Sequence, residues 1–176
     1  MTKIYIIAHR NIETLPIGIL LQSQNDFMSV SPYFTTRADK VNEYTYYLDK
    51  ETVNISYKNN SLITVSTDDN ESHGMTYDDY YNNDIFCMTL SDFNIIPEKL
   101  FRDSLENDVD MLIVWVDSST NVNKQDIIEA DYVSERLENL NYLYFCNESS
   151  ETIVNVINEY LNASDFRKEE LLLEYS

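Results

Sequence analysis

The sequence predicts a single α+β domain, in which a mostly antiparallel β-meander is followed by strand–helix units. A length of 176 residues is typical of one domain, and no linker or internal repeat divides the chain, so the predicted domain spans residues 1–176. Aromatic and β-branched segments dominate the first part, whereas apolar runs and helical periodicity alternate in the last part. A hydrophobic fraction of 43% with 14 Tyr and 7 Phe argues against disorder.

Apolar and β-branched runs predict the strands of the first part. The second of these runs contains Pro16 and Gly18, which predicts a bend or bulge. Asn59 and Asn60 separate the last two runs and tolerate the backbone conformation of a tight turn, so a meander is expected there. The expected strands are, in order, 3–8, 15–21, 33–36, 44–48, 52–57 and 61–66.

Residues 67–84 show no periodicity and predict a long acidic loop, of a length that is usually functional or mobile. Strands are then expected over 85–90, 111–116 and 142–146, and helices over 97–107 and 124–140, from Ser149 or Ser150, and from Asp165. Asn123 followed by Asp126 resembles an N-terminal cap with its acidic partner. The helix over 124–140 is expected to bury Ile127, Ala130, Val133, Leu137 and Leu140.

The negative charge is unevenly distributed, and this distribution is the strongest indication of function. The net charge is −19, yet residues 1–58 carry six acidic and six basic residues. Residues 59–98 carry eight acidic residues and no basic one, and residues 103–166 carry fourteen acidic residues against two basic ones. A one-signed electrostatic field of this kind acts on partners rather than on the fold.

We therefore expect an acidic binding protein that occupies the basic, nucleic-acid-binding surface of a partner enzyme or nuclease by competition. Antirestriction, anti-CRISPR and immunity proteins are similar to this chain in composition, and a DNA mimic of this kind would not bind nucleic acid itself. The acidic loop mixes carboxylates with Tyr, and one face of the helix over 124–140 carries three uncompensated carboxylates. The expected partner-binding residues are Asp68, Asp69, Glu71, Asp78, Asp79, Asp84, Asp131, Glu135 and Glu138.

A small α/β enzyme is the alternative, with its site at the end of the strand over 111–116. Asp117, Ser119 and Thr120 are the candidate catalytic residues, because an acidic residue at the carboxyl end of a strand is a usual place for chemistry. The segment from Asp117 to Asn121 resembles the metal-site motif Asp-x-Ser-x-Ser of von Willebrand A domains, with Asn121 in the last position. This resemblance implies a divalent metal. An acidic structural subunit of an assembly is the third hypothesis.

The composition excludes several other classes. Two glycines cannot form a dinucleotide fingerprint or a glycine-rich phosphate loop, and no cofactor is expected. No metal ligand is assigned from spacing, although scattered carboxylates could form a metal or general-acid pair in space. No apolar run is long enough to cross a membrane. Cys87 and Cys146 lie among apolar residues, which predicts buried thiols in a reducing compartment, the cytoplasm.

Overall fold

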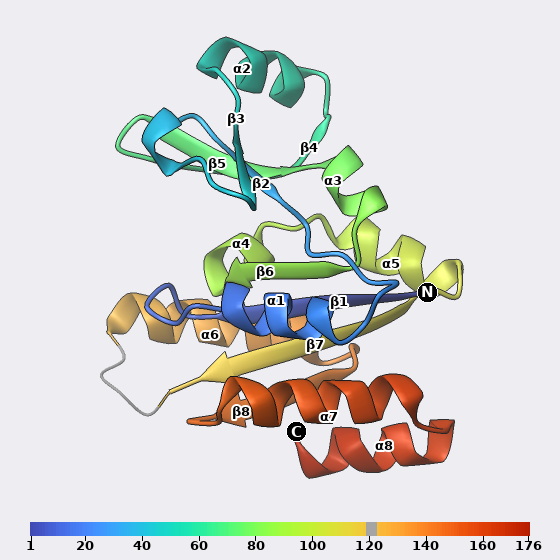
Figure 1. The fold of residues 1–176 in the computed structure, drawn as a ribbon. Helices are drawn as coiled ribbons and strands as arrows, with labels where there is room; N and C mark the ends of the chain where they lie inside the picture. The colour runs from blue at the N-terminus through green and yellow to red at the C-terminus, as the bar shows by residue number, and fades with distance from the viewer. Residues whose placement is uncertain (119–122) are drawn as a thin grey trace.

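A four-stranded parallel sheet forms the larger of two lobes in the computed structural model (Figure 1). The structure describes residues 1–118 and 123–176, apart from the side chain of Ser104. Every strand pair in this sheet is parallel, so each connection must cross over outside the sheet. The strand order is β6 (Ile85–Thr89), β1 (Thr2–Ala8), β7 (Asp110–Asp117) and β8 (Tyr142–Cys146).

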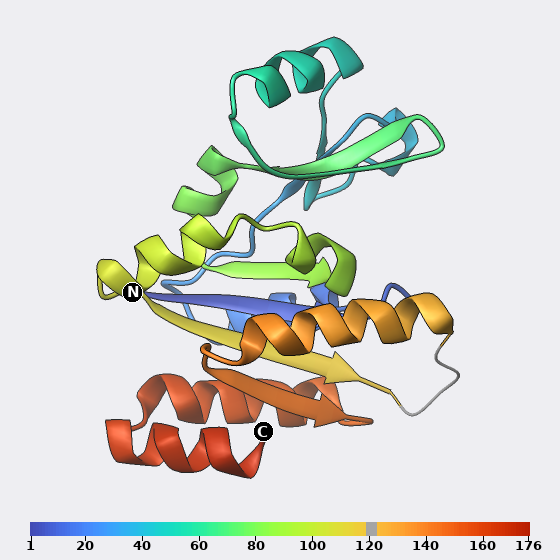
Figure 2. The same ribbon diagram turned by 180° about the vertical axis from the view of Figure 1, so that it is seen from behind.

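The parallel sheet is buried on both faces because helices cover each of them (Figures 1 and 2). Side chains alternate along β1, so that Ile4 and Ile6 face one hydrophobic core and Tyr5 and Ile7 face the other. The first core is covered by α1 (Leu15–Ser23), α7 (Ser150–Asn162) and α8 (Asp165–Glu174). The second is covered by α4 (Leu90–Asn94), α5 (Glu98–Glu106) and α6 (Lys124–Leu137).

The smaller lobe is inserted between α1 and β6 and stands above the edge of the parallel sheet in Figure 1. Its strands pair in the order β3 (Thr45–Tyr47), β2 (Tyr33–Thr35), β5 (Glu71–Thr76) and β4 (Leu62–Asp68). The helical segments of this lobe are η1 (Ala38–Lys40), α2 (Lys50–Lys58) and α3 (Tyr77–Asn82). Gly74 is required in β5, because a Cβ atom there would lie 2.0 Å from the carbonyl oxygen of Thr64 in β4.

The predicted fold class is wrong. The chain does not begin with an antiparallel meander, because β1 lies inside an all-parallel sheet. The run over 15–21 forms α1 instead of a strand, and 52–57 falls within α2, where only Val53 is buried. The segment over 67–84 is not a loop but the end of β4, a turn, β5 and α3. Strand-like composition misled the prediction because pairing partners, rather than local preference, decide strands.

Most predictions for the last part of the chain are confirmed. The strands over 85–90, 111–116 and 142–146 correspond to β6, β7 and β8. Asn123 and Asp126 form a reciprocal capping box at the start of α6, and Ser149 caps α7. Within the described part of the chain, no helix is both long and apolar enough to span a bilayer.

Candidate functional site

A cleft of about 730 Å³ lies between the two lobes, at the carboxyl ends of β1 and β6. Its floor includes Arg10 and Thr14 from the connection between β1 and α1, and Thr89 at the end of β6. Strands β2 and β3 and the turn between β4 and β5 form the opposite wall. Open α/β sheets bind ligands in the crevice outside the carboxyl ends of their strands, so this cleft is the main candidate for a small-molecule site.

Three basic side chains line this cleft, although the whole chain has a net charge of −19: Arg10, Arg37 and Lys40. Arg37 donates two hydrogen bonds to Asp39, at 3.2 Å and 2.8 Å, and this contact lowers the pKa of Asp39. Among the described residues, Arg10 and Lys40 have no carboxylate within ion-pair distance. Both are exposed, so their charges can meet an anionic group of a ligand.

Carboxylates and aromatic rings complete the lining of the cleft. The carboxylates are Glu13, Asp68, Asp69, Glu71 and Asp92, and the aromatic side chains are Tyr33, Phe34 and Tyr44. Glu71 is engaged, because it accepts a hydrogen bond from Thr36 at 2.9 Å and lies 3.6 Å from Nζ of Lys50. Phe34 is fully buried, so the ring surface that a ligand could reach belongs to Tyr33 and Tyr44, which are partly exposed. A ligand here would meet cationic groups, hydrogen-bond acceptors and parts of these two rings.

His73 and Asp92 form a polar pair on the cleft wall. Nε2 of His73 lies 3.4 Å from Oδ1 of Asp92, and this contact raises the pKa of His73. Burial raises the pKa of Asp92, but hydrogen bonds from His73, Ser66 and Thr89 outweigh burial, so the net pKa of Asp92 is lowered. A histidine held by a carboxylate can take up or release a proton near neutral pH.

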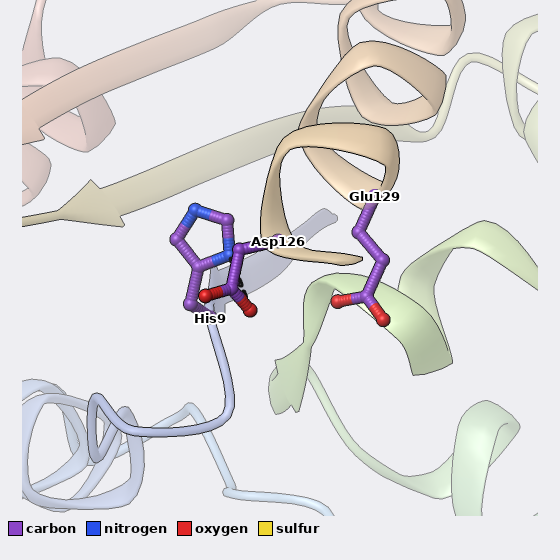
Figure 3. A group of neighbouring side chains, drawn as sticks. All are labelled: His9, Asp126 and Glu129. Atoms are coloured by element: carbon purple, nitrogen blue, oxygen red, sulfur yellow. Dashed lines mark ion pairs between the residues drawn. The ribbon is translucent and has the colours of Figure 1, made fainter. Parts of the chain in front are cut away.

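A second group of polar side chains lies beside the cleft, between β1 and α6 (Figure 3). His9 follows β1, and Asp126 and Glu129 lie on the first two turns of α6. Their candidate ligand atoms all lie within 4.8 Å of one another. Oδ1 of Asp126 lies 3.7 Å from Nδ1 of His9, along the dashed line in Figure 3. One imidazole and two carboxylates are a donor set that could hold a metal ion.

Asp117 ends β7 next to this cluster but does not line the cleft. Its Oδ1 lies 4.0 Å from Nε2 of His9, and its Oδ2 accepts a hydrogen bond from the Tyr144 hydroxyl at 2.8 Å. Burial, together with that hydrogen bond, raises the pKa of Tyr144. The other two candidate catalytic residues, Ser119 and Thr120, lie outside the described residues.

The acidic residues predicted over 67–84 fall in separate places. Asp68, Asp69 and Glu71 belong to the hairpin of β4 and β5, where they border the cleft. Asp78 and Asp79 lie on α3, which Figure 1 places at the other end of the smaller lobe from the hairpin turn. The structure therefore does not gather these carboxylates into one set.

Two of these carboxylates also have partners within the chain. Asp79 closes a capping box with Thr76 and accepts a hydrogen bond from the Tyr46 hydroxyl at 2.7 Å. Asp84 accepts a hydrogen bond from the backbone amide of Ser29 at 3.2 Å. Both carboxylates therefore support the local fold.

Asp131 and Glu135 are exposed on α6, and Glu138 is exposed at its C-cap, as their spacing predicts. Ile127 was expected to be buried but is 52% exposed, and it lies on the same outer surface as Ile128 and Tyr132. Glu129, two residues later on α6, is buried instead. Its carboxylate accepts a hydrogen bond from Ser91 of α4 at 2.6 Å, which offsets the cost of burying it. Apolar periodicity alone could not reveal that a buried carboxylate would occupy this face.

Several residues of the cleft were not predicted from the sequence. Arg37 and Lys40 lie in a segment with balanced charge, so no local pattern marks them as cleft residues. Arg10 lies at the end of the first predicted strand, but the sequence does not show that it would share a cleft with them. Outside the cleft, His9 follows the first predicted strand, and it is only 5% exposed. Cys146 was expected to be buried and is exposed, whereas Cys87 is buried as predicted.

The comparisons with known proteins give a fold and no family. No family model matches the chain, and no curated protein matches it in sequence. Among solved structures, the chain is similar to the crystal structure of guanylate kinase from Anaplasma phagocytophilum, with a TM-score of 0.51 and 14% sequence identity. The match covers 91% of this chain and 84% of the guanylate kinase. At this identity the likeness concerns the fold alone, and it agrees with the all-parallel sheet.

The connection between β1 and α1 lacks the phosphate-binding motif of P-loop phosphotransferases. P-loop phosphotransferases carry a strand, a glycine-rich segment with Gly-Lys-Ser or Gly-Lys-Thr, and a helix. Residues 9–14 contain neither glycine nor lysine, and Pro16 removes a backbone N–H from the first turn of α1. A triphosphate cradle of backbone amides is therefore not built at this position.

Proposed function

We propose that the cleft binds a small ligand with an anionic group and a planar ring, and that nucleoside monophosphates are the class that fits. The observation that carries this proposal is that Arg10, Arg37 and Lys40 line the same cleft as the partly exposed rings of Tyr33 and Tyr44. This cleft lies at the carboxyl ends of β1 and β6. Arginine recognises phosphate oxygens through paired N–H donors, and aromatic rings stack on bases.

The carboxylates of the cleft suit the remaining polar groups of such a ligand. Ionised Asp and Glu only accept hydrogen bonds, and a nucleoside offers ribose hydroxyls and, in guanine, ring N–H and amino donors. The fold likeness to a protein named guanylate kinase makes GMP the first ligand to test. Because the chain lacks a glycine-rich phosphate loop, the proposal concerns binding and not phosphoryl transfer from a nucleoside triphosphate.

Calorimetric titration of the full chain with GMP, AMP, guanosine and inorganic phosphate tests this proposal. We expect GMP to bind more tightly than guanosine or phosphate alone, because each fragment satisfies only part of the cleft. The variant Arg10→Ala should weaken GMP binding about ten- to a hundredfold, the loss expected for a charge-assisted hydrogen bond. Arg102→Ala is the matched control, since Arg102 is an exposed arginine on α5, away from the cleft.

Two outcomes would contradict the cleft proposal. One is the absence of binding by all four compounds at concentrations on the order of 1 mM, where even weak specific ligands are detected. The other is an equal loss of affinity in Arg10→Ala and Arg102→Ala, which would indicate attraction by overall charge rather than a contact in the cleft.

A second candidate function is supported by the outer surface of α6. Asp131, Glu135 and Glu138 are exposed there, and among the described residues none of them lies within ion-pair distance of a basic group. Exposed Ile127 and Tyr132 accompany them. We propose that this surface contacts a basic surface of a nucleic-acid-binding protein, where ring and aliphatic groups add contact area to charge pairing.

This second proposal is tested by affinity capture from lysate with the tagged chain, washed at low and then high salt. Proteins that bind the α6 surface should be released by salt and lost when Asp131→Asn, Glu135→Gln and Glu138→Gln are combined. A control chain with the same change of charge replaces exposed acids on or next to α7 and α8, namely Glu148, Glu169 and Glu174. Equal capture by both variants would contradict a role for α6.

Either function would operate in a reducing compartment such as the cytoplasm, a location supported by the two free cysteines.

A further inference from the structure

We propose that His9, Asp126 and Glu129 bind one divalent transition-metal cation. The group offers one imidazole nitrogen from the residue that follows β1 and two carboxylate oxygens from α6 (Figure 3). These three groups are common ligands of first-row transition metals. The proposal does not depend on nucleotide binding, and its test uses metal ions alone.

His9 carries the argument because it is buried and incompletely partnered. The residue is 5% exposed, and its Nδ1 has no hydrogen-bond partner among the described residues. The nearest oxygen given for it, Oδ1 of Asp126, lies 3.7 Å away, which is too long for a hydrogen bond. A buried polar atom without a partner is rare and costly in native proteins. A metal ion between Nδ1 and Oδ1 would provide the missing partner.

Carboxylates around His9 point to a cation rather than to a neutral ligand. Glu129 is 9% exposed, and the side chains of Asp126 and Asp117 are 15% and 20% exposed. Carboxylates that share a partly buried site repel one another, and a bound cation relieves this repulsion. A single imidazolium could compensate at most one of these three charges.

The separation of the ligand atoms fits a shared ion. At metal–ligand distances of about 2.1 Å, two ligand atoms lie roughly 3.4 Å apart in tetrahedral geometry and at most about 4.2 Å apart on opposite sides of the ion. The distance of 3.7 Å between Nδ1 of His9 and Oδ1 of Asp126 falls within this range. The limit of 4.8 Å for the whole group exceeds that range by about 0.6 Å, so the ligand side chains would have to move inward by up to about that distance when the ion binds.

Neighbouring groups hold the proposed ligands in place. Oδ1 of Asp117 faces the other ring nitrogen of His9 at 4.0 Å, and Asp117 is itself fixed by the Tyr144 hydroxyl. Oε1 of Glu129 accepts a hydrogen bond from Ser91 at 2.6 Å. A carboxylate behind a ligating histidine and a hydrogen bond to a ligating carboxylate are recurring supports of metal sites.

The donor set also indicates which ions should bind. An imidazole ligand favours Zn²⁺ or Mn²⁺ over Mg²⁺, which prefers oxygen ligands and retains its water. Three protein ligands leave coordination positions for water or for an oxygen of another ligand. Because Arg10 follows His9 and lines the cleft, such a ligand would approach from the cleft.

Titration of the metal-free full chain with Zn²⁺, Mn²⁺ and Mg²⁺ tests the proposal. Calorimetry measures the affinity and stoichiometry of each ion, and paramagnetic resonance measures the uptake of Mn²⁺. We expect one equivalent of Zn²⁺ or Mn²⁺ to bind, with Mg²⁺ at least tenfold weaker. Glu129→Gln keeps the size and hydrogen-bond acceptor of the side chain but removes the anionic ligand, and it should weaken Zn²⁺ binding by roughly 100-fold.

A chain of this acidity also attracts cations without a specific site, so a matched control is required. Glu135→Gln removes the same charge from the exposed surface of α6 and should leave the affinity unchanged within about twofold. Circular dichroism of each variant without metal establishes that the fold is retained. His9→Asn is a second ligand variant, and it should abolish one-equivalent binding.

Three results would overturn the proposal. The first is the absence of stoichiometric binding by Zn²⁺ and Mn²⁺ at concentrations on the order of 1 mM. The second is an equal effect of Glu129→Gln and Glu135→Gln on affinity. The third is unchanged Zn²⁺ binding in a folded His9→Asn variant, which would place the ion elsewhere.

Discussion

Replacing Arg136 with Ala would test what holds α4, α5 and α6 together on one face of the parallel sheet. The Arg136 guanidinium, on α6, donates hydrogen bonds to the carbonyl oxygens of Phe93, at 2.5 Å, and Ile96. Its central carbon lies 5.5 Å from the ring centre of Phe93 and 4.9 Å from that of Phe101. The side chain is half-buried, and this burial lowers the pKa of Arg136.

The magnitude follows from these contacts. A hydrogen bond from a charged group contributes about 1.5–3 kcal/mol, and a cation over an aromatic ring about 0.5–1 kcal/mol. Two hydrogen bonds and two ring contacts sum to roughly 4–8 kcal/mol. Water can replace part of these contacts at a half-buried side chain. We therefore expect Arg136→Ala to lower the free energy of unfolding by about 2–4 kcal/mol. Arg136→Lys keeps the charge but not the forked donors, and should lose about half as much.

Urea unfolding at neutral pH, followed by circular dichroism, measures both changes. Arg102→Ala, on the exposed surface of α5, should stay within about 0.5 kcal/mol of the unsubstituted chain. The reasoning is refuted if Arg136→Ala lowers the free energy of unfolding by less than about 1 kcal/mol, because the loss of a half-buried guanidinium with two carbonyl partners should cost more than that. It is also refuted if Arg136→Lys costs as much as Arg136→Ala.

Three further predictions concern single sites. Gly74→Ala should disrupt the smaller lobe, since the new methyl group would meet a backbone carbonyl of β4 at 2.0 Å, and a loss of at least about 2 kcal/mol in urea unfolding checks it. Asp92 raises the pKa of His73, so this pair should stabilise the fold below the ordinary histidine pKa of 6.5, and the stabilisation should be lost as pH rises through the raised pKa. His73→Gln should flatten this part of a pH–stability profile, and an unchanged slope would contradict the prediction. Cys146 should react with a thiol reagent in the folded chain at pH 8, whereas Cys87, whose pKa burial raises to about 12, should react only on unfolding, which timed labelling with mass spectrometry distinguishes.

Two of the segments whose structure was wrongly predicted carry local helix signals. Pro16 fits the first turn of a helix, and the structure places it there in α1, although it was interpreted as a bend in a strand. Asp49 caps α2 by accepting a hydrogen bond from the amide of Thr52 at 2.8 Å. The β-branched and aromatic residues after Asp49 favoured a strand, yet Ile55 and Tyr57 are exposed on that helix. A capping residue was the better guide here, because it acts through the adjacent backbone.

The sequence by itself determined the features that depend on neighbouring residues. Asn123 and Asp126 predicted the start of α6, and the apolar run over 111–116 predicted a buried strand. The spacing of Asp131 and Glu135 predicted an exposed acidic helix face. Capping, apolar runs and helical periodicity act over a few residues, so they can be recognised without knowing which distant segment packs against them.

Only the tertiary structure decided the parallel order of the sheet and the composition of both candidate sites. Parallel pairing joins β1 to β6 and β7, which follow it by more than 75 residues, and no local pattern encodes that choice. The same crossover connections carry His9 to Asp126 and Glu129, and bring Arg10 opposite Arg37. Each of these side chains is unremarkable in its own segment. Their chemistry arises from proximity, and proximity is set by packing across the whole chain.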